Sequence, residues 1–106
     1  MNAVNEQDWK LFRAKLPGWQ EAYITKLNQE YIQILSHDGS SADAFWKLEK
    51  RIRRDKNSVG VIAEMSRSRM ELNLIALLND HAITFDDLDG FSEELVNRLR
   101  FFLGSI

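Results

Sequence analysis

Hydrophobic residues recur along the chain at intervals of three and four, which is the spacing of one face of an α-helix. Near the start, Trp9, Phe12 and Leu16 follow this spacing. In residues 19–37, apolar side chains share an arc of about 120° when each residue turns the helix by about 100°. The sequence shows no clean alternation of apolar and polar residues, the pattern of a half-buried strand. The pattern therefore predicts an all-α fold.

Proline and glycine divide this pattern into segments. Pro17 and Gly18 are predicted to end the first helix, because proline disfavours helical geometry in the residue before it. Asn5 is the expected cap at the start of that helix. A second helix is predicted over residues 19–37, with Gly39 ending it.

Further helices are predicted in the second half of the chain. One covers residues 42–56, and another runs from near residue 59 or 61 to residue 79, with a stretch LNLIALL that is apolar nearly all the way round. A capping-box pattern precedes a short turn at 85–89, and Ser92 caps the last helix. We expect a compact all-α bundle of four main helices plus one short helical turn near residues 85–89, in a single domain spanning residues 1–106.

The composition excludes several kinds of chemistry and location. The chain has no cysteine, which rules out disulfides, thiolate metal sites and cysteine nucleophiles and favours a reducing compartment. The longest apolar run, Leu74 to Leu78, is far shorter than the ~20 residues of a membrane-spanning helix. The start, MNAVNEQDWK, lacks the pattern of a secretory signal. We therefore expect a cytoplasmic protein.

Charge is distributed unevenly along the sequence. Residues 1–46 carry a net charge of −2, residues 47–69 carry +5 and residues 70–106 carry −5. The basic segment contains KLEKRIRRDK at positions 47–56, in which six of ten residues are cationic. This segregation of charge makes the basic helix the first candidate for a binding surface.

Two faces are predicted for the helix over residues 42–56. At about 100° per residue, Phe45, Leu48 and Ile52 fall within roughly 60° and are expected to face the core. A cationic stripe is expected on the opposite side, made of Lys47, Lys50, Arg51 and Arg54.

Three hypotheses account for this stripe. It is a solvated surface, with Glu49 paired to Arg53 and Arg51 to Asp55 at the four-residue spacing. Alternatively, it pairs with the acidic residues of 86–94, within or between subunits. The third hypothesis is that it binds nucleic-acid phosphates. A sequence pI of about 5.6 weighs against nucleic acid. The helix-turn-helix-like passage 83–103 also weighs against nucleic acid, because two carboxylates stand at the start of its last helix and would repel phosphate.

Trp46 is predicted to lie about 100° away from the Phe45 face and close to Lys50 and Arg53. An exposed tryptophan with cations beside it is a typical hot spot of a protein interface. Trp46 therefore joins the cationic residues as a candidate partner-binding residue.

No catalytic, cofactor or metal motif is found in the sequence. His37 and His81 have no ligand-type neighbours at helical spacing. The acidic stretch DDLDGFSEE fails as a calcium loop, because placing Gly90 at the required glycine puts Phe85 and Val96 at ligand positions. We therefore predict no enzyme activity, no cofactor and no small-molecule substrate.

Three stretches, WxxFRxKLPxWQ, DGSSADAFWKLEKRI and ITFDDLDGFSEEL, resemble a group of small, uncharacterised all-helical proteins of Gram-positive bacteria. The resemblance implies a cytoplasmic helical fold and no activity. Proteins of this kind sometimes carry a transporter label, which the lack of a spanning segment contradicts.

The functional hypothesis from sequence is a protein–protein interaction or regulatory module without catalysis, acting on a protein partner or on itself. A reciprocal pairing of the +5 and −5 segments across a two-fold axis would give a dimer that weakens with salt. The alternative is a nucleic-acid-associated accessory protein that binds phosphates through the basic helix at 47–54.

Overall fold

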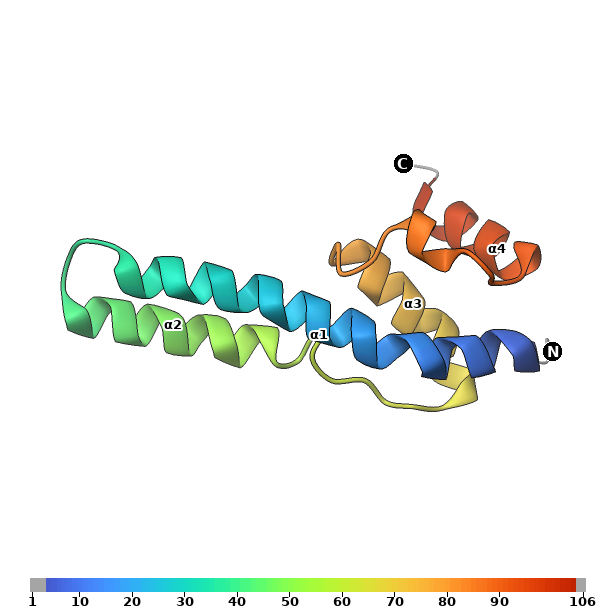
Figure 1. Ribbon diagram of the computed structural model, residues 1–106, viewed down its shortest axis with the longest axis horizontal. Helices are drawn as coiled ribbons and strands as arrows, with labels where there is room; N and C mark the ends of the chain where they lie inside the picture. Colours follow the sequence, from blue (N-terminus) through green and yellow to red (C-terminus); the bar gives the residue numbers. More distant parts are fainter. Residues whose placement is uncertain (1–3, 105–106) are drawn as a thin grey trace.

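The computed structural model describes residues 4–104 and confirms an all-α fold, with no strand in this part of the chain. The four main helices are α1 (Glu6–Ser36), α2 (Ser41–Asp55), α3 (Met70–Asn79) and α4 (Glu93–Gly104). Two short 3₁₀ turns precede α3 and α4, namely η1 (Arg67–Arg69) and η2 (Phe85–Leu88). The short turn predicted near residues 85–89 is therefore present (Figure 1).

The prediction that the first helix ends at Pro17 is wrong, since α1 is continuous over 31 residues with Pro17 inside it. Proline leaves the carbonyl of residue 13 without its helical partner, and both Arg13 and Pro17 are exposed, so water can satisfy that group. Core contacts hold the helix on either side of the proline: Phe12 is fully buried and its ring centroid lies 6.4 Å from that of Trp19.

The hydrophobic core lies at one end of the molecule, between the first half of α1, α3, η2 and α4 (Figure 1). Its fully buried side chains are Phe12, Leu74, Leu77, Leu95 and Leu99. The buried carboxylate of Asp8, near the start of α1, connects this helix to the residue that precedes α4. It accepts hydrogen bonds from the amide of Ser92 at 2.8 Å and from the Ser92 hydroxyl at 2.6 Å. We call residues 4–23 and 56–104 the body.

The helix predicted to start near residue 59 or 61 does not form there, because residues 56–66 are a loop and α3 starts at Met70. Two side chains fix this loop: Gln20 donates to the carbonyl of Val59 and the buried Asn73 donates to that of Glu64, both at 3.0 Å. A Cβ at Gly60 would lie 2.3 Å from the Tyr23 ring, so the loop crosses α1 at a contact that requires glycine.

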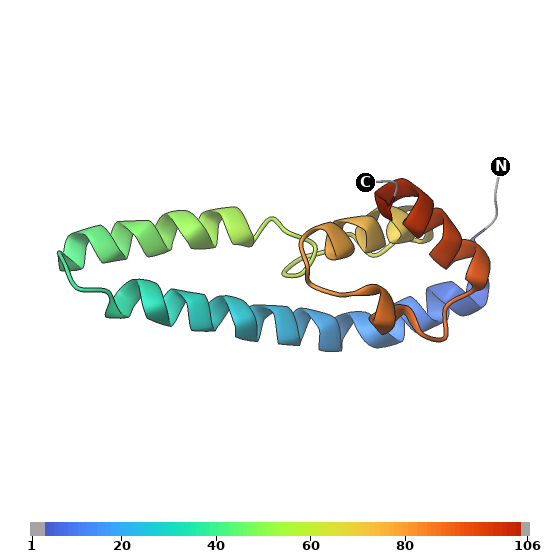
Figure 2. The same cartoon turned by 90° about the horizontal axis from the view of Figure 1, so that it is seen from above.

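The second half of α1 and all of α2 form an antiparallel hairpin that projects from the body (Figures 1 and 2). We call residues 24–55 the hairpin. The molecule measures 54 × 28 × 22 Å, and its radius of gyration of 16.5 Å exceeds the ~13 Å typical of a compact chain of this length. The shape is therefore more elongated than the compact bundle expected from sequence.

Candidate functional site: the basic groove of the hairpin

One line of residues on α2 packs against α1. Ala44, Leu48 and Arg51 are partly buried and Asp55 is buried, at intervals of four, three and four. Phe45 and Ile52, predicted to face the core, are instead 59% and 42% exposed. The predicted inward face is therefore wrong for Phe45 and Ile52, whereas Leu48, also predicted to face inward, lies on the packing line. The hairpin stands away from the body, so no core lies beside α2 to bury these two side chains.

Polar contacts fix this rotation of α2. The hydroxyl of Tyr31 donates to Asp55 Oδ2 at 2.6 Å, and Arg51 Nη2 donates to Glu30 Oε1 at 2.8 Å. The same Arg51 nitrogen lies 3.5 Å from Asp55 Oδ2, and the guanidinium carbon of Arg51 lies 5.8 Å from the centroid of the Tyr31 ring. Two ion pairs and an aromatic contact thus place Arg51 between the two helices.

The network also sets the ionisation of its members. Burial, together with the hydrogen bond to Asp55, raises the pKa of Tyr31 to about 12. Burial alone would raise the pKa of Asp55, but hydrogen bonds from Tyr31 and Arg54 and the charge of Arg51 outweigh it, and the pKa lies below its usual value. The hydrogen bond to Glu30 raises the pKa of Arg51. At neutral pH the network therefore holds a neutral phenol and a charged carboxylate–guanidinium pair.

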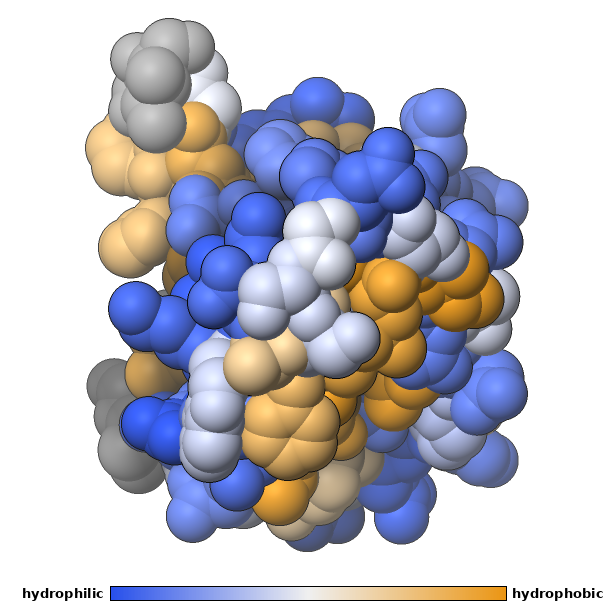
Figure 3. Space-filling view, turned by 90° about the vertical axis from the view of Figure 1, so that its left-hand side faces the viewer, coloured by the Kyte–Doolittle hydropathy of each residue, from blue (hydrophilic) through white to orange (hydrophobic). Residues whose placement is uncertain are grey.

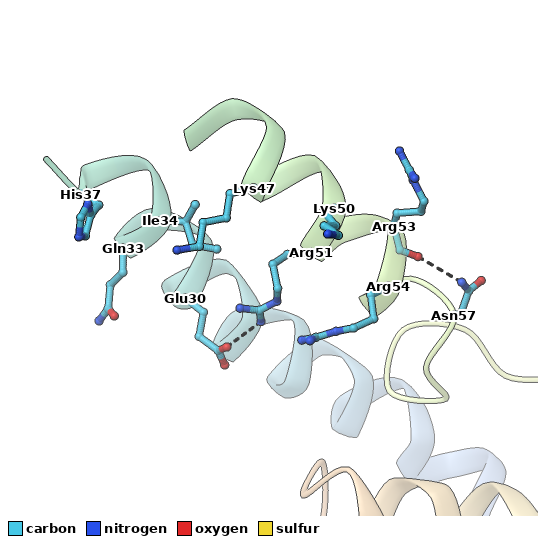
Figure 4. Close-up of a pocket in the computed structure, with 10 residues that line it drawn as sticks. All are labelled: Glu30, Gln33, Ile34, His37, Lys47, Lys50, Arg51, Arg53, Arg54 and Asn57. Carbon is cyan, nitrogen blue, oxygen red and sulfur yellow. Dashed lines mark hydrogen bonds and ion pairs between the residues drawn. The ribbon is translucent and has the colours of Figure 1, made fainter. Parts of the chain in front are cut away.

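An open groove of about 1020 Å³ lies along one side of the hairpin, over this network (Figure 4). Residues from both helices line it: Glu30, Gln33, Ile34, His37, Lys47, Lys50, Arg51, Arg53, Arg54 and Asn57. Five of these side chains are basic and Glu30 is the one acid among them. We call this surface the basic groove.

The structure brings all four residues of the predicted cationic stripe to the basic groove, but not in one role. Lys47 and Lys50 are exposed, and no ion pair to either occurs among residues 4–104. Arg54 Nε donates to Asp55 Oδ1 at 3.2 Å while its side chain stays 70% exposed. Arg51 was predicted to face water and does not, since it is held against α1 with 24% of its side chain exposed.

Both predicted ion pairs on α2 are confirmed. Arg53 donates to Glu49 through two nitrogens, and Arg51 forms an ion pair with Asp55. The groove residues contributed by α1 were not predicted. Glu30 and Gln33 of α1, and His37 directly after it, lie at intervals of three and four. This spacing is visible in the sequence. It does not show which side of α1 faces the basic helix, because that also depends on the rotation of α2.

Trp46 is 62% exposed, as expected from its position on α2. Its ring meets that of Phe45 edge to face, with centroids 4.9 Å apart and an interplanar angle of 88°. The two aromatic rings form an exposed corner near the connecting loop of the hairpin.

The side of the hairpin opposite the basic groove is hydrophobic. On α2, Phe45 and Ile52 lie roughly 70–90° to one side of the packing line, and Lys47 and Arg54 lie as far to the other side. α1 adds apolar residues to the first side, so the surface comprises Ile24, Ile32, Leu35, Phe45 and Ile52. We call it the apolar flank. Figure 3, which looks onto the loop end of the hairpin, shows hydrophobic residues gathered in a band between hydrophilic ones.

The acidic residues near the C-terminal end lie on the body, around η2 and the start of α4. Asp87 accepts a hydrogen bond from the amide of Thr84 at 2.7 Å, as its capping-box spacing predicts. Within residues 4–104, no ion pair joins these acids to a basic residue of α2. The hypothesis of pairing within one subunit therefore finds no support in the described ion pairs.

In residues 4–104 no group of three histidine, aspartate or glutamate side chains is arranged to hold a metal ion. None of the helices described has the length and hydrophobicity needed to cross a bilayer. The chain matches no family model, no curated protein and no solved structure.

Proposed function

We propose that this chain is a small cytoplasmic protein-interaction module without catalysis, and that it binds an acidic segment of a partner protein in the basic groove. The observation that carries the proposal is the composition of the groove lining, five basic side chains against one acid. A protein of net charge −2 that gathers so much positive charge on one side of a projecting element presents it to a partner.

The individual side chains suit this role. Lys47 and Lys50 can form ion pairs with partner carboxylates without breaking a pair already described. Arg51 is held in place by Glu30 and Tyr31, so its position is set before a ligand arrives. Ile34 gives the groove an apolar patch, and a cleft between two antiparallel helices accommodates a third helix that carries acidic residues.

Nucleic-acid phosphates are the second candidate ligand. Lys47, Lys50 and Arg54 lie at intervals of three and four, so they form a continuous row that can follow a phosphate backbone. The acidic start of α4 and the sequence pI of about 5.6 favour a protein partner over DNA.

The first prediction compares two charge reversals. Binding of a fluorescently labelled oligoglutamate peptide, measured by anisotropy at low ionic strength, should weaken about five- to tenfold in Lys50→Glu. Lys10→Glu makes the same change of net charge on an exposed α1 lysine of the body, and it should leave binding close to that of the wild type. Helical content by circular dichroism should be equal in all three proteins.

Equal loss of binding in Lys50→Glu and Lys10→Glu would show that the peptide responds to overall charge, and it would refute the groove as the site. The same measurement with duplex DNA separates the two candidate ligands. Tighter binding of DNA than of the peptide, with the same dependence on Lys50, would replace the acidic protein partner by a nucleic acid.

A further inference from the structure

The apolar flank is the largest feature of the hairpin that the proposed function does not use. Four of its residues are 42–61% exposed: Ile32, Leu35, Phe45 and Ile52. Exposed hydrophobic residues are ordinary when scattered, but here they follow one side of two packed helices for most of the hairpin's length.

The hairpin has very little core of its own. Leu27 and Asp55 are its buried residues, and the polar network around Arg51 lies within the contact between α1 and α2. Burial of apolar area is the main stabilising contribution in helix packing, at about 25 cal/mol per Å². Two antiparallel helices that bury few apolar residues between them and expose one apolar side resemble one half of a four-helix bundle.

The charged residues near the apolar flank determine which kind of partner can cover it. Beside Phe45 and Ile52, the charged residues are Glu49, Arg53 and Lys56, and the first two neutralise each other. On α1 the polar residues between the apolar ones, Thr25, Asn28 and Ser36, are uncharged, and Glu21, one turn before Ile24, is the charged residue on this side. Two copies can therefore approach through this side with little repulsion, whereas the five basic side chains of the groove would repel their counterparts in a second copy.

We propose that a second copy of this chain covers the apolar flank, so that two hairpins form an antiparallel four-helix bundle around a two-fold axis. An axis perpendicular to the hairpin sets the loop end of one copy, with the large Phe45 ring, against the opposite end of the other, where the smaller Ile24 lies. The two bodies then lie at opposite ends of the bundle. The basic groove, on the other side of each hairpin, stays open.

The second prediction concerns the mass of the full-length protein in solution, measured by light scattering after size exclusion and by sedimentation equilibrium. The wild type should have twice the monomer mass of 12.4 kDa. Leu35→Asp and Phe45→Asp should each weaken dimerisation tenfold or more. Leu72→Asp is the matched control: Leu72 is 50% exposed on α3 and Leu35 is 56% exposed on α1, and the control should remain a dimer.

Salt gives an independent test, because an apolar interface should persist at about 1 M salt, where the screening length is ~3 Å. A dimer that dissociates on adding salt would indicate the +5/−5 charge pairing considered from sequence and would overturn the apolar interface. A wild type that stays monomeric at high concentration, or a dimer unaffected by both Leu35→Asp and Phe45→Asp, would also overturn it. Oligoglutamate binding should survive in Leu35→Asp, so failure of the dimer and failure of the groove are distinguishable.

Discussion

At the scale of single residues, Asp55 decides how the two helices of the hairpin meet. It is 6% exposed and accepts hydrogen bonds from Tyr31 and Arg54 while Arg51 lies beside it. A buried carboxylate is tolerated when it is hydrogen-bonded and paired, and removing such a partner leaves the rest uncompensated. The spacing of Arg51 and Asp55 predicted their pair, but no sequence pattern joins Tyr31 to Asp55 across 24 residues.

The third prediction follows from the lowered pKa of Asp55. Such a carboxylate stabilises the fold above its unfolded pKa of about 3.9, and this contribution is lost as pH falls through the lower folded value. Asp55→Asn should therefore reduce the free energy of unfolding by about 1–3 kcal/mol at pH 7 and by less near pH 3.

Urea unfolding at the two pH values, followed by circular dichroism, measures this difference. Asp38→Asn changes an exposed carboxylate in the connecting loop and should have little effect at either pH. A destabilisation by Asp55→Asn that is as large at pH 3 as at pH 7 would contradict the assigned role of the charged carboxylate.

At the scale of elements, the sequence predicted where helices lie better than where they end or how they are rotated. The cap at Asn5 holds as predicted, because a side chain that accepts an N-terminal amide acts locally. Pro17 was misleading because core contacts on both sides of it hold α1 together. The rotation of α2 was misjudged because the Phe45–Leu48–Ile52 pattern predicts burial, and the structure places no body beside it.

The loop between α2 and α3 shows how a tertiary contact overrides local preference. The sequence around residues 59–66 reads as the start of a helix, yet Gly60 lies where any side chain would meet the ring of Tyr23. This contact, with the hydrogen bond from Gln20 to Val59, turns the chain along α1 and sets where α3 starts.

The fourth prediction contrasts two glycines. Gly60→Ala should destabilise the fold by about 1–3 kcal/mol, because the added methyl overlaps the Tyr23 ring. Gly18→Ala places the same methyl in the middle of α1 with no atom within 4 Å, and should stabilise it by about 0.5–1 kcal/mol. Thermal unfolding of both variants checks the two signs. A stabilising Gly60→Ala would mean that the loop does not cross α1 as described, and a destabilising Gly18→Ala would mean that α1 is interrupted at the proline.

At the scale of the whole molecule, the division into a body and a projecting hairpin is what makes both binding surfaces possible. If α2 folded back onto the body, the basic groove and the apolar flank could not both be open. The sequence indicated an all-α chain with a basic helix, but local patterns do not encode the distance between that helix and the core. The two-part shape therefore emerged from the structure alone.

The most direct test of this arrangement, and the fifth prediction, is the radius of gyration in solution. Small-angle X-ray scattering of Leu35→Asp at low concentration isolates the single chain from the proposed dimer. A projecting hairpin predicts a radius of gyration at or slightly above 16.5 Å, with a maximum dimension of at least 54 Å. A value near the ~13 Å of a compact chain of this length would contradict the projecting hairpin and both surfaces that depend on it.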